Sequence, residues 1–125
     1  MDSTAAPADL VQILFAALNS RDLSSLDHCL SEDAGFDFPG PGLIRGREKI
    51  LLFLKILFRK FTRLTFSVTR IIAEKDCACA IWTNVGEDRA GKSYSNRGIT
   101  LLELKESKII FLSDYFKDTS FTNGT

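Results

Sequence analysis

The chain has 125 residues, 45% of them hydrophobic and 26% charged, which is typical of a folded globular domain and excludes disordered or membrane-spanning proteins. Sixteen Lys and Arg residues balance sixteen Asp and Glu residues, so the charge gives no reason to expect nucleic acid or an anionic membrane as a partner. Apolar runs such as Ile50–Leu54 are far too short to cross a bilayer, and Met1–Thr4 does not open a signal segment. We therefore expect a cytoplasmic protein.

The first part of the chain is predicted to be helical. The apolar residues of segment 7–20 recur at helical spacing: Leu10, Ile13, Leu14, Ala17 and Leu18. Pro7 suits the first turn of this helix. Asp22 is a good N-cap for a second, short helix that carries Leu23, Leu26 and Leu30 on one side. A short strand over residues 34–38 is then predicted to end at the Pro-Gly-Pro-Gly sequence of residues 39–42.

A third and longer helix is predicted to begin at Gly46 and to run to about Phe61. Glu48 in its first turn suits the positive end of the helix dipole. One continuous apolar stripe runs along this helix: Ile50, Phe53, Leu54, Leu57, Phe58 and Phe61. Basic residues at four-residue steps follow a separate face, and we interpret that face as a solvated flank rather than a site for an anionic partner.

After Thr62 the period of the pattern changes from helical to two. A strand is predicted over residues 64–69, and three more over residues 77–88, 93–105 and 108–116, with turns between them. Three helices followed by an antiparallel meander are typical of an α+β fold. We expect one domain, with a core from about residue 9 to residue 121, in which three N-terminal helices pack on a curved, mostly antiparallel sheet and close an apolar pocket.

The last predicted strand is apolar on both faces. Alternation places Ile110, Leu112 and Phe116 on one side of this strand. It places Ile109, Phe111 and Tyr115 on the other side. Because an antiparallel sheet normally leaves one face to water, a second covering layer is needed. A second copy of the chain is the simplest one, so we predict a homodimer packed sheet to sheet.

The three cysteines indicate neither a disulfide nor a metal site. Cys77 and Cys79 stand two residues apart in a predicted strand, so they share a face but are poorly placed to bond each other. A metal site would need both to converge with Cys29 and His28, and no CxxC pair supports that arrangement. We expect buried, reduced thiols, a structural role for His28, and no metal or organic cofactor.

Asp114 is the first candidate catalytic residue. It shares its predicted face with Leu112 and Phe116, so we expect all three to line the same apolar space. A carboxylate in such a place is costly unless it is hydrogen-bonded or protonated, and desolvation raises its pKa. A carboxyl group tuned toward neutrality is what a general acid or base needs. The alternative is an Asp near a strand end that binds backbone amides.

Asp37 is the second candidate. It lies between Phe36 and Phe38, so the two aromatic residues share one face of the strand and Asp37 takes the other. If that other face is the concave one, two carboxyl groups approach the same cavity, and each raises the pKa of its neighbour. The alternative is an Asp that stabilises the turn before Pro39.

Small and polar residues suited to orienting a ligand alternate along the strand predicted over residues 93–105: Tyr94, Asn96, Gly98 and Thr100. Gly98 leaves room for close approach or marks a bend in the sheet. On the neighbouring strand, Trp82 and Asn84 share one face and Thr83 lies on the other. Parity alone does not say which of these faces is concave, so all three remain candidate ligand contacts.

The order of these elements resembles the nuclear transport factor 2-like superfamily in its SnoaL-like branch. The matching local sequences are Ile44-Arg-Gly-Arg-Glu, Tyr94-Ser-Asn-Arg-Gly, and the segment from Lys108 to Asp118 that contains Ser-Asp-Tyr-Phe-Lys-Asp. The resemblance covers about residues 9–121. It implies a cone-shaped α+β barrel, commonly dimeric, with a pocket between sheet and helices. Relatives include polyketide cyclases, steroid isomerases, limonene epoxide hydrolases and non-catalytic binding domains.

The resemblance also bears on individual residues. Asp114 matches the pocket acid that the cyclases and limonene epoxide hydrolases keep, and Asp37 falls near a position that orients water in the hydrolases. Those hydrolases also need an Arg and an Asp on the second long strand. An ungapped reading puts Ile81 and Thr83 at those places, and a shifted register puts Trp82 and Asn84 there. Neither pair carries the required charges, so epoxide hydrolysis is not expected.

The resulting hypothesis is cofactor-free proton transfer through Asp114 on a small apolar molecule, of isomerase, cyclase or lyase type. Tyr94 or Asn96 would stabilise the developing oxyanion. The alternatives are a non-catalytic ligand-binding domain and a protein-interaction domain.

Overall fold

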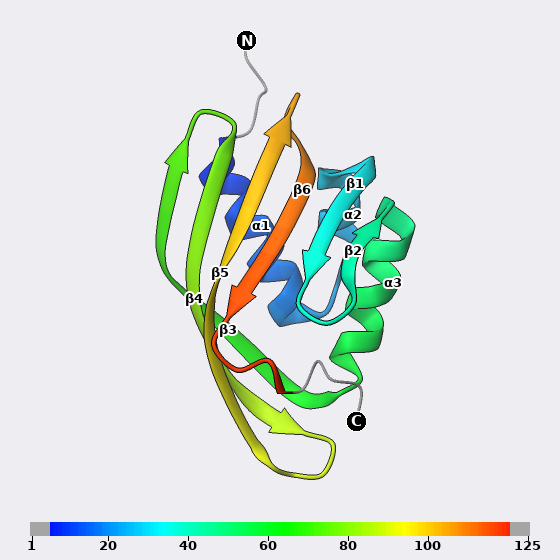
Figure 1. Cartoon of the computed structure of the whole chain (residues 1–125), viewed down its shortest axis with the longest axis vertical. Coiled ribbons are helices and arrows are strands. Elements are labelled where there is room, and N and C mark those ends of the chain that lie inside the picture. Colours follow the sequence, from blue (N-terminus) through cyan, green and yellow to red (C-terminus); the bar gives the residue numbers. More distant parts are fainter. Residues whose placement is uncertain (1–5, 121–125) are drawn as a thin grey trace.

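The structure is a computed structural model that describes residues 6–120. Within this range three helices pack on a six-stranded, mostly antiparallel sheet in the order β2-β1-β6-β5-β4-β3 (Figure 1). The helices are α1 (Pro7–Ser20), α2 (Ser24–Cys29) and α3 (Arg47–Phe58). The strands are β1 (Leu30–Phe38), β2 (Gly42–Arg45), β3 (Phe61–Glu74), β4 (Cys77–Asp88), β5 (Ser93–Lys105) and β6 (Lys108–Phe116). The α+β class is confirmed. The sheet is not closed into a barrel, because β2 and β3 are its two edges.

Alternation and turn residues located the last three strands well, and the earlier elements less well. The bounds of β4, β5 and β6 agree with the prediction. In contrast, β1 begins at Leu30, where the second helix was expected to continue, and the short edge strand β2 was not predicted. The helix α3 ends at Phe58, and Phe61 already belongs to β3. The predicted core end at residue 121 and the segment Met1–Thr4 lie outside the described residues.

The helices cover one face of the sheet, with α1 and α2 behind the strands in Figure 1 and α3 beside β1 and β2. Apolar residues of α1, chiefly Leu10, Val11, Leu14 and Phe15, are buried against the strands. The end of α1 is fastened to the β3 edge, because the Asn19 carboxamide both donates to the Phe66 carbonyl (3.0 Å) and accepts from the Phe66 amide (2.7 Å). These contacts hold α1 over the concave side of the sheet.

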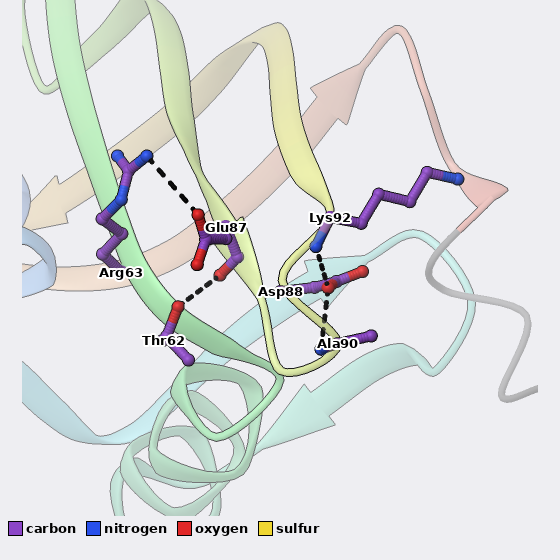
Figure 2. A network of polar contacts seen from close by, with 6 residues as sticks. All are labelled: Thr62, Arg63, Glu87, Asp88, Ala90 and Lys92. Carbon is purple, nitrogen blue, oxygen red and sulfur yellow. Dashed lines mark hydrogen bonds and ion pairs between the residues drawn. The ribbon is translucent and has the colours of Figure 1, made fainter.

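The β4–β5 hairpin is closed by its own side chains (Figure 2). The Asp88 carboxylate accepts hydrogen bonds from the backbone amides of Ala90 and Lys92, each at 2.9 Å. On the neighbouring strand the Thr62 hydroxyl donates to the Glu87 carbonyl at 3.1 Å. The expected turn at residues 89–92 is therefore confirmed, and the network joins the end of the hairpin to β3.

A β-bulge in β6 changes which residues share a face. Glu103 pairs with Phe111 and Leu104 pairs with Ile109, so Ile110 is an extra residue in β6. As a result Ile109 is fully buried in the same cluster as Leu112, although strict alternation had placed the two on opposite faces. That prediction was wrong because a bulge shifts the alternation of faces by one residue. In a run of apolar residues the sequence pattern does not reveal such a shift.

The outer face of the sheet, away from the helices, carries exposed apolar side chains. Ile99 is opposite Ile81 on β4 and opposite Tyr115 on β6, so the three form a row across the sheet. Ile99 is 40% exposed and Tyr115 is 61% exposed. This row is where a second copy would pack, and the sheet-to-sheet homodimer stays a prediction.

The dimer prediction is tested by introducing positively charged residues into this row. Lysines at Ile99 and Tyr115 would have to lose their hydration in a sheet-to-sheet interface, so we expect the double variant to raise the dimer dissociation constant by about 100-fold or more. Sedimentation velocity at micromolar concentration measures the dimer fraction directly. The control is Leu52→Lys, a charge placed on an exposed position of α3. A wild-type protein that sediments as a monomer at these concentrations contradicts the prediction.

No helix between residues 6 and 120 combines the length and the apolarity that crossing a bilayer requires. The cytoplasmic location stays a prediction.

Candidate functional site

A cavity opens between α1, α3 and the concave face of the sheet. The space between the protein atoms is about 660 Å³, with its open mouth included. Most of its lining is apolar. The residues that bring polar atoms to it are Trp82, Asn84, Tyr94, Asn96, Thr100 and Asp114.

Three of these residues form a hydrogen-bonded chain across β4, β5 and β6. The Trp82 indole N–H donates to the Thr100 hydroxyl oxygen at 2.9 Å, and the Thr100 hydroxyl donates to Asp114 Oδ1 at 2.6 Å. The indole N–H can only donate, so the Thr100 hydroxyl keeps its own proton available for the carboxylate form of Asp114. In this arrangement Asp114 Oδ1 accepts the hydrogen bond from Thr100, and Oδ2 is the oxygen that this bond leaves available to a proton.

The surroundings of Asp114 favour its neutral form. Its side chain is largely enclosed by protein, and the surface it keeps lines the cavity. Burial raises the pKa of Asp114 from the ordinary 3.8 to about 7, although the hydrogen bond from Thr100 lowers it in part. Near neutral pH both protonation states are therefore populated, which suits a group that takes up and releases protons.

Tyr94 and Asn96 form a polar pair at the hairpin side of the cavity, and hydrogen bonds of Asn96 hold it in place. Asn96 Nδ2 donates to the Tyr94 hydroxyl oxygen and to the Asp118 carbonyl, each at 2.8 Å. Burial raises the pKa of the Tyr94 phenol, which the hydrogen bond from Asn96 lowers and the nearby Asp118 charge raises. Because both amide hydrogens of Asn96 are engaged, the structure does not offer Asn96 as an oxyanion donor.

Two predicted site residues lie away from the cavity. Phe36 and Phe38 line it, so Asp37 between them points to the outer face, where it is exposed opposite Leu43. A second carboxyl group therefore does not join Asp114, and the expectation of a carboxyl pair was wrong. Thr83 is likewise exposed on the outer face, because its neighbours Trp82 and Asn84 line the cavity.

Gly98 fits the close approach that was predicted for it. A Cβ atom there would fall on the backbone carbonyl oxygen of Tyr115, 2.7 Å from the Cβ of Phe116 and 2.8 Å from Cζ2 of Trp82. Only a residue without a side chain leaves room here for the Trp82 ring, whose N–H reaches Thr100 on the same strand. Leu112 and Phe116 also line the cavity.

Sequence reasoning missed much of the aromatic wall. Phe15 from α1 and Phe66 from β3 contact each other edge to face, with 5.6 Å between their ring centroids, and both line the cavity. Phe38 packs on Phe116 at 5.3 Å. The alternation around Asp37 marked Phe36 and Phe38 as sharing a face, but it did not say that this face was the concave one.

A sequence profile described as a SnoaL-like domain matches residues 11–112. The chain belongs to the SnoaL-like family. The resemblance noted from the sequence is therefore confirmed. No curated protein matches the chain.

Solved structures show that this SnoaL-like chain shares its fold with several proteins. An NTF2-like protein from Anabaena variabilis has a TM-score of 0.80 at 23% identity, covering 89% of this chain and 86% of that one. A loop truncation variant of IdmH has a TM-score of 0.79 at 22% identity, covering 89% and 92%. TerC, co-crystallised with polyporic acid, has a TM-score of 0.83 at 14% identity, covering 94% and 95%. At these identities the likeness establishes the fold alone.

Residues 6–120 of this SnoaL-like domain bring together no group of three or more His, Cys, Asp or Glu side chains that could hold a metal. The three cysteines are free and half-buried, where fuller burial had been expected. The absence of a metal or organic cofactor stays a prediction.

Proposed function

We propose that this SnoaL-like domain binds a small, mostly apolar carbonyl compound in its cavity and moves a proton on it through Asp114, without a cofactor. The observation that carries the proposal is the setting of Asp114, a carboxyl group with a pKa of about 7 held in an apolar cavity by the Trp82–Thr100 chain. Such a group is ionised often enough to act as a base and protonated often enough to act as an acid.

One carboxyl group is enough for an isomerisation. In the ionised form, Asp114 Oδ2 takes a proton from the carbon next to the ligand carbonyl, and the electron pair of the broken C–H bond moves into the enolate. The same oxygen then returns the proton to another carbon of the conjugated system, so the carboxylate is restored and the compound is isomerised. The Thr100 hydroxyl keeps Oδ1 occupied throughout, which leaves Oδ2 to exchange the proton.

A related structure supports an organic ligand in this fold. TerC, which shares the fold along 94% of this chain, was co-crystallised with polyporic acid. The cavity of this chain has aromatic walls from Phe15, Phe66 and Trp82, and these suit a flat ring better than a flexible acyl chain.

The proposal is tested by hydrogen–deuterium exchange on simple enolisable ketones. We expect the wild-type protein to accelerate the exchange of the α-protons of 2-tetralone in deuterated water, with a rate that rises as the pH passes about 7, where the base form of Asp114 accumulates. Asp114→Asn removes the base, so we expect the acceleration to fall by about 10²- to 10⁴-fold. Proton NMR follows the exchange.

The matched control is Asp37→Asn, which removes an exposed carboxyl group on the outer face and should leave the exchange rate unchanged. Saturable binding of the ketone without any exchange would mean that the domain binds its ligand without turnover. An Asp114→Asn variant as active as the wild type would remove Asp114 from the chemistry.

A further inference from the structure

We infer that Asn84 is the second polar anchor of the ligand and that it accepts a hydrogen bond from a hydroxyl or N–H group at the far end of the ring compound whose carbonyl lies at Asp114. The inference rests on the proposed function and deepens it. It assigns the ligand class as a fused-ring carbonyl compound with a hydrogen-bond donor on the opposite end.

The observation that carries the inference is a buried acceptor without a donor. Asn84 is 4% exposed and lines the cavity, and its Oδ1 has no hydrogen-bond partner among residues 6–120. A buried polar atom without a partner is costly, and native proteins keep few of them. A cost of this kind at a cavity wall is explained when a ligand supplies the missing donor.

The neighbours of Asn84 do not supply that donor. Its partner on β5 is Asn96, whose two amide hydrogens are committed to Tyr94 and Asp118. Its partner on β3 is Phe66, which has an apolar side chain. The nearest polar group on the same face of β4 is the Trp82 indole, whose single N–H is given to Thr100. None of these neighbouring groups therefore donates to the Asn84 acceptor, which is buried in the wall of the cavity.

The register of the sheet sets the length of the ligand. Asn84 on β4 is opposite Asn96 on β5, whereas Asp114 on β6 is opposite Thr100, four residues further along β5. With strands about 4.8 Å apart and a rise of about 3.3 Å per residue, the two Cα atoms are roughly 16 Å apart along the sheet. Both residues line the concave side of the sheet, so their polar ends are closer together than their Cα atoms. Two fused rings with a polar group at each end fit this span.

A pair of coumarins tests the assignment, because they differ at a single position, where a hydroxyl donor is replaced by a methoxy group that cannot donate. We expect the wild-type protein to bind 7-hydroxycoumarin about tenfold or more tightly than 7-methoxycoumarin at pH 6, since the methoxy oxygen cannot donate to Asn84. In Asn84→Leu the preference should vanish, because the hydroxyl then loses its acceptor. Isothermal titration calorimetry gives both affinities, and the shift of the Trp82 indole proton shows that the ligand lies in the cavity.

The free protein provides a second readout. Because Asn84→Leu removes an unpaired buried acceptor, we expect it to raise the melting temperature of the unliganded protein by roughly 3–6 °C. If the leucine does not fit, Asn84→Ala replaces it in the binding experiment. The control is Thr83→Val, next in sequence but on the outer face, which should leave the coumarin preference unchanged.

Equal wild-type affinity for the two coumarins, a preference that survives in Asn84→Leu, or no saturable binding of either compound would overturn the inference. A melting temperature that falls in Asn84→Leu, although the variant keeps the wild-type amide spectrum and so accommodates the leucine, would also overturn it, because the carboxamide would then be satisfied within the protein. Failure of the proposed function looks different. In that case the exchange on 2-tetralone is absent, while the coumarin preference still depends on Asn84.

Discussion

Replacing Asp114 by asparagine is expected to abolish a fall in stability that we predict for the wild-type protein between pH 4 and pH 8. The pKa of Asp114 is about 7 in the folded protein and 3.8 in the unfolded chain, so between these values the folded state holds a proton that the unfolded state has lost. The contribution of Asp114 to stability is therefore greatest below pH 3.8 and is lost as the pH rises through 7. The loss is at most about 4 kcal/mol, because the surface that Asp114 keeps on the cavity reduces the effect.

Urea denaturation at several pH values measures this effect. The difference in unfolding free energy between the wild type and Asp114→Asn isolates the titration of this one group, because the other groups titrate alike in both proteins. We expect the asparagine variant to be the more stable protein above pH 7. For Asp37→Asn, the unfolding free energy plotted against pH should run parallel to that of the wild type. Parallel curves for Asp114→Asn as well would show that the carboxyl group is hydrated in the folded state.

Substituting Gly98 by alanine is expected to lower the free energy of unfolding by about 3 kcal/mol or more. The new methyl group would fall on the backbone carbonyl oxygen of Tyr115 and 2.8 Å from the Trp82 ring. A backbone oxygen on a paired strand moves only if β5 and β6 separate, and the Trp82 ring can move only by leaving Thr100. The substitution therefore disturbs both the pairing of β5 with β6 and the hydrogen bond from Trp82 to Thr100 in the cavity wall.

The control for this substitution is Gly35→Ala on β1. Its methyl group would meet the Cδ1 atom of Leu43 at 3.2 Å, and that atom ends a flexible, exposed side chain. We expect a loss below about 1 kcal/mol there. Urea denaturation ranks the two variants, and similar losses at both glycines would show that β5 and β6 tolerate the methyl group.

The sequence predicted the fold best where the local alternation of residues and the turn residues alone determine the structure. The strands β4, β5 and β6 are long, alternate clearly and are separated by polar turn residues, so their bounds followed from pattern alone. The strand β2 has four residues at an edge, too few for a periodic signal. The start of β1 at Leu30 depends on its parallel pairing with Ile109, a contact between residues far apart in sequence.

The candidate site was predicted in part for similar reasons. Between Leu112 and Phe116 the strand is regular, so parity correctly put Asp114 on the same side as those two apolar residues. Parity left the concave side of β1 and β4 open, and this is why Asp37 and Thr83 were retained as candidates. The bond from Trp82 to Thr100 depends on the register between β4 and β5, which local pattern does not determine.

The hydrogen-bonded chain has a practical consequence as well. Trp82 is the sole tryptophan of the chain, so the intrinsic fluorescence of the protein comes mainly from an indole two hydrogen bonds away from the ionising carboxyl group. The emission spectrum thereby reports the charge of Asp114 and the filling of the cavity from within, with no dye or label to perturb either.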